Sequence, residues 1–157
     1  MHSKAVAHSH HFDLPPRVTR ITEHSFSECT SLTLITLYQR VTSIGSSAFH
    51  SYYSLTSIDI PQGVTSINQD NFRNYFTLVS VTLPQHLTSI REGAFRVCSS
   101  LSSIALPKDV RLIEYFAFRH CIYLVSIAIP QGVASIGQVA FYHCTSLASI
   151  ALPGALK

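Results

Sequence analysis

Residues 90–112 read IREGAFRVCSSLSSIALPKDVRL, and residues 113–135, which follow without a gap, read IEYFAFRHCIYLVSIAIPQGVAS. Each segment has 23 residues, and isoleucine, phenylalanine, cysteine, leucine, proline and valine stand at matching positions in both. A match of this kind predicts a chain that uses one short structural unit repeatedly.

The 23-residue interval runs through almost the whole chain, with no insertion. We call each copy a rung, so that rung 1 begins at Ile21 and rung 6 at Ile136. A half unit, Phe12 to Val18, precedes rung 1. The apolar columns are Ile21, Ile44, Ile67, Ile90, Ile113 and Ile136; Phe26, Phe49, Phe72, Phe95, Phe118 and Phe141; and Leu32, Leu55, Leu78, Leu101, Leu124 and Leu147. Proline recurs as Pro61, Pro84, Pro107, Pro130 and Pro153, with Tyr38 in the first copy.

A unit of this length is too short to bury a core alone, so the units are expected to stack into a solenoid. Ile104 and Leu106 alternate with Ala105, which predicts a short strand with one buried face. Pro107 then ends the strand, because proline cannot donate the next ladder hydrogen bond. Stacked strands of this kind form a parallel sheet with a step of ~4.8 Å per rung.

The opposite side of each rung has a different spacing. Phe95, Cys98 and Leu101 are three residues apart, a spacing that favours one or two helical turns. The expected fold class is therefore α/β leaning towards β: a solenoid of 23-residue rungs with a parallel β-sheet on one face and short helical turns on the other. We expect a disordered, polar, histidine-containing tail at residues 1–11 and a single solenoid of about six rungs at residues 12–157.

Composition excludes some classes of protein. The charged residues are only 12% of the chain and the formal charge is +3, too little to argue for nucleic-acid binding. No apolar run approaches the ~18 residues of a membrane helix. The start of the chain also lacks the apolar core of ~7–15 residues that a secretory signal needs.

The four cysteines are the first candidates for chemistry, because Cys29, Cys98, Cys121 and Cys144 occupy one column. A tetrahedral metal site needs thiolates that converge on one ion, whereas these would stand in a row. Disulfides between rungs are disfavoured because the side chains of a column run parallel. We therefore interpret the cysteines as small buried hydrophobes and expect free thiols. No set of histidines, carboxylates or glycines forms a recognisable active site, so we expect no enzyme, no metal and no cofactor.

Two exposed columns are the candidate binding residues. One follows the phenylalanines and contains Arg73, Arg96 and Arg119, which would form a basic stripe unless they are simply a solvated edge. The other lies on the outward side of the strands, and its candidates are Ser57, Asp59, Ser80, Thr82, Ser103 and Ser126. Small side chains there suit close approach by an extended partner surface, and they equally suit solubility alone.

The pattern L-x-x-I-x-L/I-P-x-x-V-x-x-I-x-x-x-x-F-x-x-C resembles the BspA-type leucine-rich repeats over roughly residues 12–156. The resemblance implies a leucine-rich repeat solenoid without a catalytic centre in its repeats. It also implies a cell-surface or secreted protein that takes part in adhesion. The expected function is a non-catalytic binding or adhesion module for a protein partner or, less favoured, a glycan, with no nucleic acid and no membrane span.

An alternative function starts from Thr42, Thr65 and Thr88, because ice-binding and other structural solenoids carry regular threonine and serine ladders. This column is interrupted at Arg111 and Ala134. We also expect the chain to belong to a longer protein or to self-associate through its C-terminal rung, because no polar capping segment follows Leu156. Substitution of Ile150 by lysine should then suppress the association.

Overall fold

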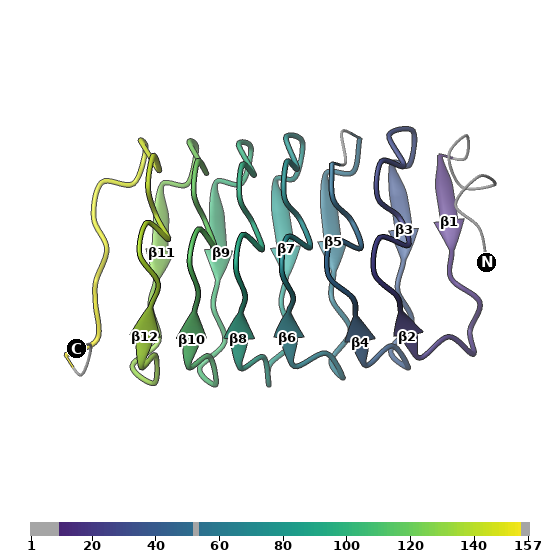
Figure 1. The fold of residues 1–157 in the computed structure, drawn as a ribbon, viewed down its shortest axis with the longest axis horizontal. Coiled ribbons are helices and arrows are strands. Elements are labelled where there is room, and N and C mark those ends of the chain that lie inside the picture. Colours follow the sequence, from purple (N-terminus) through teal and green to yellow (C-terminus); the bar gives the residue numbers. More distant parts are fainter. Residues whose placement is uncertain (1–9, 52–53, 155–157) are drawn as a thin grey trace.

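The computed structural model describes residues 10–51 and 54–154 of the chain. These residues form a parallel β-solenoid with two rows of strands (Figure 1). Each of rungs 1 to 5 contributes one strand to each row, the half unit contributes β1 to the odd row, and rung 6 contributes only to the even row. The odd-numbered strands are β1 (His11–Asp13), β3 (Leu34–Thr36), β5 (Ser57–Asp59), β7 (Ser80–Thr82), β9 (Ser103–Ala105) and β11 (Ser126–Ala128). The even-numbered strands are β2 (Arg20–Ile21), β4 (Ser43–Ile44), β6 (Ser66–Ile67), β8 (Ser89–Ile90), β10 (Leu112–Ile113) and β12 (Ser135–Ile136).

All strand pairs are parallel, and their register equals the sequence repeat. Ile104 pairs with Ile127, and Ile90 pairs with Ile113. The even row includes one sheet of four strands, β6, β8, β10 and β12, whereas the odd row is hydrogen-bonded in the pairs β1–β3, β5–β7 and β9–β11. The expected tail of residues 1–11 falls mostly outside the described residues, and His11 already lies in β1.

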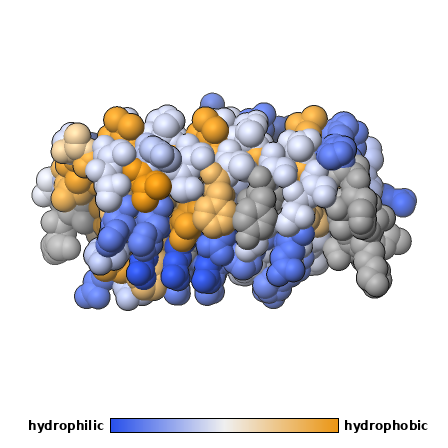
Figure 2. All heavy atoms as spheres, turned by 90° about the horizontal axis from the view of Figure 1, so that it is seen from above, coloured by the Kyte–Doolittle hydropathy of each residue, from blue (hydrophilic) through white to orange (hydrophobic). Residues whose placement is uncertain are grey.

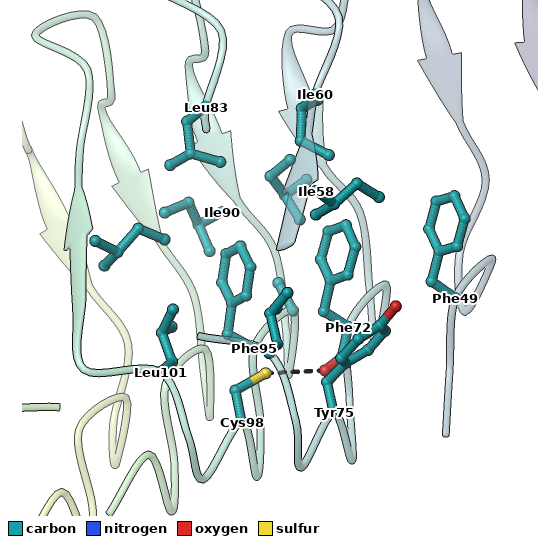
Figure 3. Close-up of a cluster of buried hydrophobic side chains, with 14 of the residues drawn as sticks. Phe49, Ile58, Ile60, Phe72, Tyr75, Leu83, Ile90, Phe95, Cys98 and Leu101 are labelled. Atoms are coloured by element: carbon teal, nitrogen blue, oxygen red, sulfur yellow. Dashed lines mark hydrogen bonds between the residues drawn. The ribbon is translucent and has the colours of Figure 1, made fainter. Parts of the chain in front are cut away.

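The core is a set of continuous apolar columns. Phe49, Phe72, Phe95 and Phe118 are fully buried. Consecutive phenylalanine rings from Phe26 to Phe141 stack face to face, with centroids 5.3–5.6 Å apart. Figure 3 shows the rings of Phe49, Phe72 and Phe95 in line beside buried isoleucines and leucines of the same rungs. Each rung thus buries its apolar side chains mainly against the rungs before and after it, as the repeat predicted.

The expected helical turns are wrong, because the described residues contain no helix. The residues three apart instead form successive three-residue turns, in which Cys98 N donates to Phe95 O and Leu101 N donates to Cys98 O. Alternate amides donate to the next rung and not within the turn: Phe95 N donates to Ala117 O at 2.8 Å, and Val97 N donates to Arg119 O at 2.8 Å. A helix would need these amides for its own i→i−4 bonds. Residues 10–51 and 54–154 accordingly contain no helix long and apolar enough to cross a membrane.

Left-handed residues also prevent a helix on this side. Positive φ recurs at two positions per rung, four residues apart, as in Gly93 and Val97, which have φ of 62° each. The first position is occupied by His24, Ser47, Asp70, Gly93, Phe116 and Val139, and the second by Glu28, Ser51, Asn74, Val97, His120 and His143. Isolated left-handed residues reverse the course of the chain, so the backbone here is a series of turns.

Candidate interaction surfaces

The structure brings the predicted strand-side residues together on one surface, which we call the sheet face. Ser57, Asp59, Ser80, Thr82, Ser103 and Ser126 are all exposed. They lie on β5, β7, β9 and β11, with Ser57 opposite Ser80 and Ser103 opposite Ser126. They point outward because side chains alternate along a strand and the intervening Ile58, Val81, Ile104 and Ile127 point towards the core.

Three apolar side chains on the sheet face were missed by the sequence analysis. Leu34 is 50% exposed, Val79 is 49% exposed and Val125 is 57% exposed. Val79 and Val125 stand immediately before β7 and β11, in a column otherwise filled by threonine, serine and alanine. The signal was visible in the repeat, because these residues break a small or polar column. Figure 2 shows apolar residues recurring along one long edge of the molecule and hydrophilic residues along the opposite edge.

The arginine column lies on the turn side, one residue after the stacked phenylalanines. Arg73, Arg96 and Arg119 are half-buried, and the Nε atom of each is buried without a hydrogen-bond partner. Burial, reinforced by the charges of Arg73 and Arg119, lowers the pKa of Arg96 from its ordinary value. The three guanidinium groups are therefore close enough to repel one another.

Aromatic side chains surround the later part of this column. The Cζ atoms of Arg96 and Arg119 lie 5.2 Å and 4.8 Å from the centroid of the Phe116 ring, and Arg119 Cζ lies 5.3 Å from that of Tyr142. The His120 and His143 rings stack with centroids 4.8 Å apart. Tyr142 was expected beside the arginines, because it occupies their column in rung 6. The contact of Phe116 with two of them was not expected, although Phe116 stands at a fixed offset of three residues before Arg119.

The four cysteines of one column lie inside the solenoid. All four cysteines are free and buried. Cys98 Sγ donates to Phe72 O at 3.0 Å (Figure 3). Cys121 and Cys144 make the same bond to Phe95 O and Phe118 O at 3.1 Å. Burial raises the pKa of the Cys98 and Cys121 thiols. Within the described residues, no three histidine, cysteine or acidic side chains are grouped as metal ligands would be.

The threonine column of the alternative function bonds to the backbone. Thr42 Oγ1 donates to Thr19 O at 3.3 Å, and Thr88 Oγ1 donates to Thr65 O at 2.9 Å. Each of these hydroxyls thus bonds to the backbone 23 residues earlier in the chain. A hydroxyl used in this way is less available for contact with an external surface such as ice.

Comparison with known proteins identifies the repeat. The sequence profile of the BspA type leucine-rich repeat region matches residues 7–99 and 65–157, with six copies. Among curated proteins, none matches the sequence of this chain.

Three solved structures show the same architecture. A leucine-rich repeat protein of T. pallidum is 27% identical with a TM-score of 0.83, and the alignment covers 92% of this chain and 71% of that protein. A leucine-rich repeat protein of Bacteroides ovatus shares the fold at 24% identity and a TM-score of 0.74, over 93% of this chain and 44% of that one. A leucine-rich cell surface protein of Faecalibacterium prausnitzii is 29% identical with a TM-score of 0.57, over 90% of this chain and 31% of its own length.

Proposed function

The chain belongs to the BspA-type leucine-rich repeat family, and we propose that it is a non-catalytic interaction module whose sheet face holds a protein partner. The observation that carries this proposal is the continuous exposed strip over β5, β7, β9 and β11, where serine, threonine and alanine alternate with the exposed Val79 and Val125. The cell-surface description of the F. prausnitzii protein is consistent with a role in adhesion, which we extend to this chain as part of the proposal.

The chemistry of the sheet face favours a protein over a glycan. Small side chains lose little conformational entropy when a partner covers them, so more of the binding free energy is retained. Exposed aliphatic side chains gain from apolar contact with a partner. A glycan presents mainly hydroxyl groups, whose loss of water Val79 and Val125 could not compensate with hydrogen bonds.

Photo-crosslinking tests this function. A photoreactive residue in place of Ser103 should capture a protein that mass spectrometry identifies, and its affinity is then measured with the purified chain. Ala128→Arg should weaken that affinity by about tenfold or more, because it places a long charged side chain on the contact surface. Ala134→Arg is the matched control: Ala134 is also exposed in rung 5, but its column already contains Arg111 in rung 4. Equal affinities for the two variants would contradict a sheet-face site.

We also propose self-association through the last rung. Leu152 is 56% exposed, whereas its counterpart Ile129 is buried. Ile129 itself lines a surface depression together with Leu106 and Pro130. A second copy that covered these side chains would gain roughly 25 cal/mol per Å² of apolar surface. Sedimentation should show mass rising with concentration, and Leu152→Lys should suppress this rise while Ala105→Lys does not. A monomer at every concentration would contradict the proposal.

A further inference from the structure

The arginine column differs between rungs in whether a carboxylate accompanies the guanidinium. In rung 3, Asp70 Oδ2 lies 3.6 Å from Arg73 Nη1, three residues along the chain. The positions that correspond to Asp70 in rungs 4 and 5 are Gly93 and Phe116. Across the described residues, neither Arg96 nor Arg119 has an ion pair with a carboxylate. A carboxylate therefore forms an ion pair with this guanidinium position in rung 3, whereas in rung 4 the charges of Asp70 and Glu92 act on Arg96 without an ion pair.

Aromatic rings hold these two arginines in place. Phe116 has a guanidinium within 4.8 Å and another within 5.2 Å of its ring centroid, and Tyr142 has Arg119 at 5.3 Å. Stacking on a ring leaves the N–H donors in the plane of a guanidinium available for a bidentate partner. Because Nε of each arginine is buried, the donors available to a partner belong to the Nη groups.

Phe116 occupies a backbone position that disfavours it. Its φ is 60°, in the left-handed region, where a bulky residue is an outlier and costs roughly 1 kcal/mol or more. Other rungs satisfy the same turn with Ser47, Asp70 or Gly93, so the turn itself does not need an aromatic side chain. Backbone strain of this kind gathers at functional sites, and here the strained residue is the one that contacts both unpaired arginines.

We propose that Arg96 and Arg119 bind the carboxylates of an acidic segment in a protein partner, in the way that Asp70 pairs with Arg73. This inference rests on the proposed function in taking a protein as the partner, but it uses a different surface from the sheet face. The proposed ligand of Arg96 and Arg119 is an extended segment with acidic residues at alternate positions.

The dimensions of the column fit such a segment. The neighbouring Phe95 and Phe118 rings lie 5.4 Å apart, which gives the step between the two arginines. Alternate side chains of an extended peptide lie on the same side about 6.6 Å apart. Long arginine side chains absorb that difference. The amides of Phe95 and Val97 already donate to the next rung, so side chains rather than backbone would recognise the segment.

A protein segment that carries carboxylates is favoured over a nucleic acid as the ligand of these arginines. Nucleic-acid bases need free aromatic faces for stacking, and guanidinium groups lie over the rings of Phe116 and Tyr142. Arginine and carboxylate form bidentate, charge-assisted hydrogen bonds. The chain itself supplies a carboxylate at the equivalent position of rung 3, as Asp70.

The test uses a fluorescent peptide with glutamate at every second residue and a matched peptide with glutamine. Fluorescence anisotropy should show that the wild-type chain binds the glutamate peptide, and that the affinity falls as salt is raised. The double variant Arg96→Gln, Arg119→Gln should bind about tenfold or more weakly. The control Arg17→Gln, Arg40→Gln makes the same change of net charge at exposed positions elsewhere and should leave binding unchanged.

Two single variants separate the arginine site from general charge. Phe116→Asp places a carboxylate three residues before Arg119, as Asp70 stands before Arg73, and should abolish most of the binding. Phe116→Asn is its uncharged control and should bind more tightly than Phe116→Asp. Asp70→Asn releases Arg73 from its own carboxylate and should strengthen binding, because it extends the available column to three arginines. Circular dichroism checks that each variant keeps the fold.

Several outcomes would overturn the inference. They are equal binding of the glutamate and glutamine peptides, equal loss in the Arg17/Arg40 control, or arginine-dependent binding of heparin or single-stranded DNA without binding of the glutamate peptide. Ala128→Arg should leave peptide binding unchanged, so the two proposals fail separately. Failure of the peptide overturns only the arginine site, and insensitivity of the crosslinked partner to Ala128→Arg overturns only the sheet-face function.

Discussion

The five-residue sequence Ser-Ile-Ala-Leu-Pro occurs twice, at residues 103–107 and at residues 149–153, and the two copies have different structures. In rung 4 the first three residues form β9, which pairs along its length with β11, and Ile104 is buried. In rung 6 only an isolated bridge joins Ala151 to Ala128, Ile150 is half-buried and Leu152 is 56% exposed. Figure 1 shows this last segment following β11 at the end of the odd row, without a strand of its own.

Identical local sequences therefore do not have identical structures in this molecule. Ile104 lies on β9, which contacts both β7 and β11, whereas the segment of Ile150 is joined to β11 alone, through the bridge of Ala151 to Ala128. Stability in a solenoid is the sum of the rungs and their interfaces, so a segment with one interface gains less than a segment with two. Packing between rungs, more than the preference of the residues, holds the strands in place.

Removal of one ring from the phenylalanine stack should give the largest difference between the two regions. Phe95→Ala deletes a fully buried ring that stacks on both Phe72 and Phe118, and should lower the free energy of unfolding by about 3–5 kcal/mol. Phe141→Ala removes a half-buried ring and should cost roughly half as much. Arg96→Ala, the neighbouring control, should cost under about 1 kcal/mol. Urea denaturation measures all three, and equal losses would contradict the stacked-rung architecture.

The repeated pentapeptide offers a closer comparison at the level of one side chain. Ile104→Ala should cost about 2–4 kcal/mol, because it leaves a cavity between two rungs. Ile150→Ala should cost under about 1.5 kcal/mol, because that side chain is already half-exposed. Ser103→Ala and Ser149→Ala are matched controls on the exposed side of the same segments. If the two isoleucines proved equivalent, the last segment would pack as well as β9.

Thiol reactivity should distinguish the same regions through local opening. Cys98 and Cys121 are fully buried and should react very slowly with a thiol reagent, because burial raises their pKa and excludes the reagent. Cys144, in rung 6, is 9% exposed and should react at least about tenfold faster, which corresponds to roughly 1.4 kcal/mol. Peptide mass spectrometry after brief labelling gives the order. Rapid labelling of Cys98, or a mass that reveals a disulfide, would be inconsistent with the buried column.

Relief of backbone strain should give the smallest effect and one of opposite sign. Val97 in rung 4 and Val139 in rung 6 are branched residues with φ of 62° and 55°. Asparagine tolerates this region better and already occupies the column of Val97 in rung 3, as Asn74. Val97→Asn should raise the free energy of unfolding by about 0.5–1 kcal/mol. Val139→Asn should raise it less, if rung 6 opens before the rest. A loss of stability at Val97 would show that its packing outweighs the strain.

The parallel solenoid, its register and its buried columns could be predicted from the sequence, because every copy carries the same apolar positions. Ile90, Phe95 and Leu101 were expected inside from their spacing alone, and all three are fully buried. The helical turns could not be predicted correctly. A spacing of three residues fits a helical turn and a chain of three-residue turns equally well, and the choice depends on which rung accepts the amides of Phe95 and Val97.

The candidate surfaces were predicted in part. The column positions of Ser103 and Arg96 follow from the repeat, since a position that avoids apolar residues in a stack must face outward. Their surroundings do not follow from it. Asp70 and Arg73 stand three residues apart in rung 3, and whether they pair depends on the turn that joins them. Whether Arg96 lies over Phe116 depends on how side chains of the adjacent rungs 4 and 5 are placed in space. The sequence by itself determined which side chains point inward, because burial of apolar surface repeats with every unit. Only the tertiary structure decided that Arg96 lies over Phe116 of the next rung and how the last Ser-Ile-Ala-Leu-Pro lies, because both depend on contacts between rungs that no single unit contains.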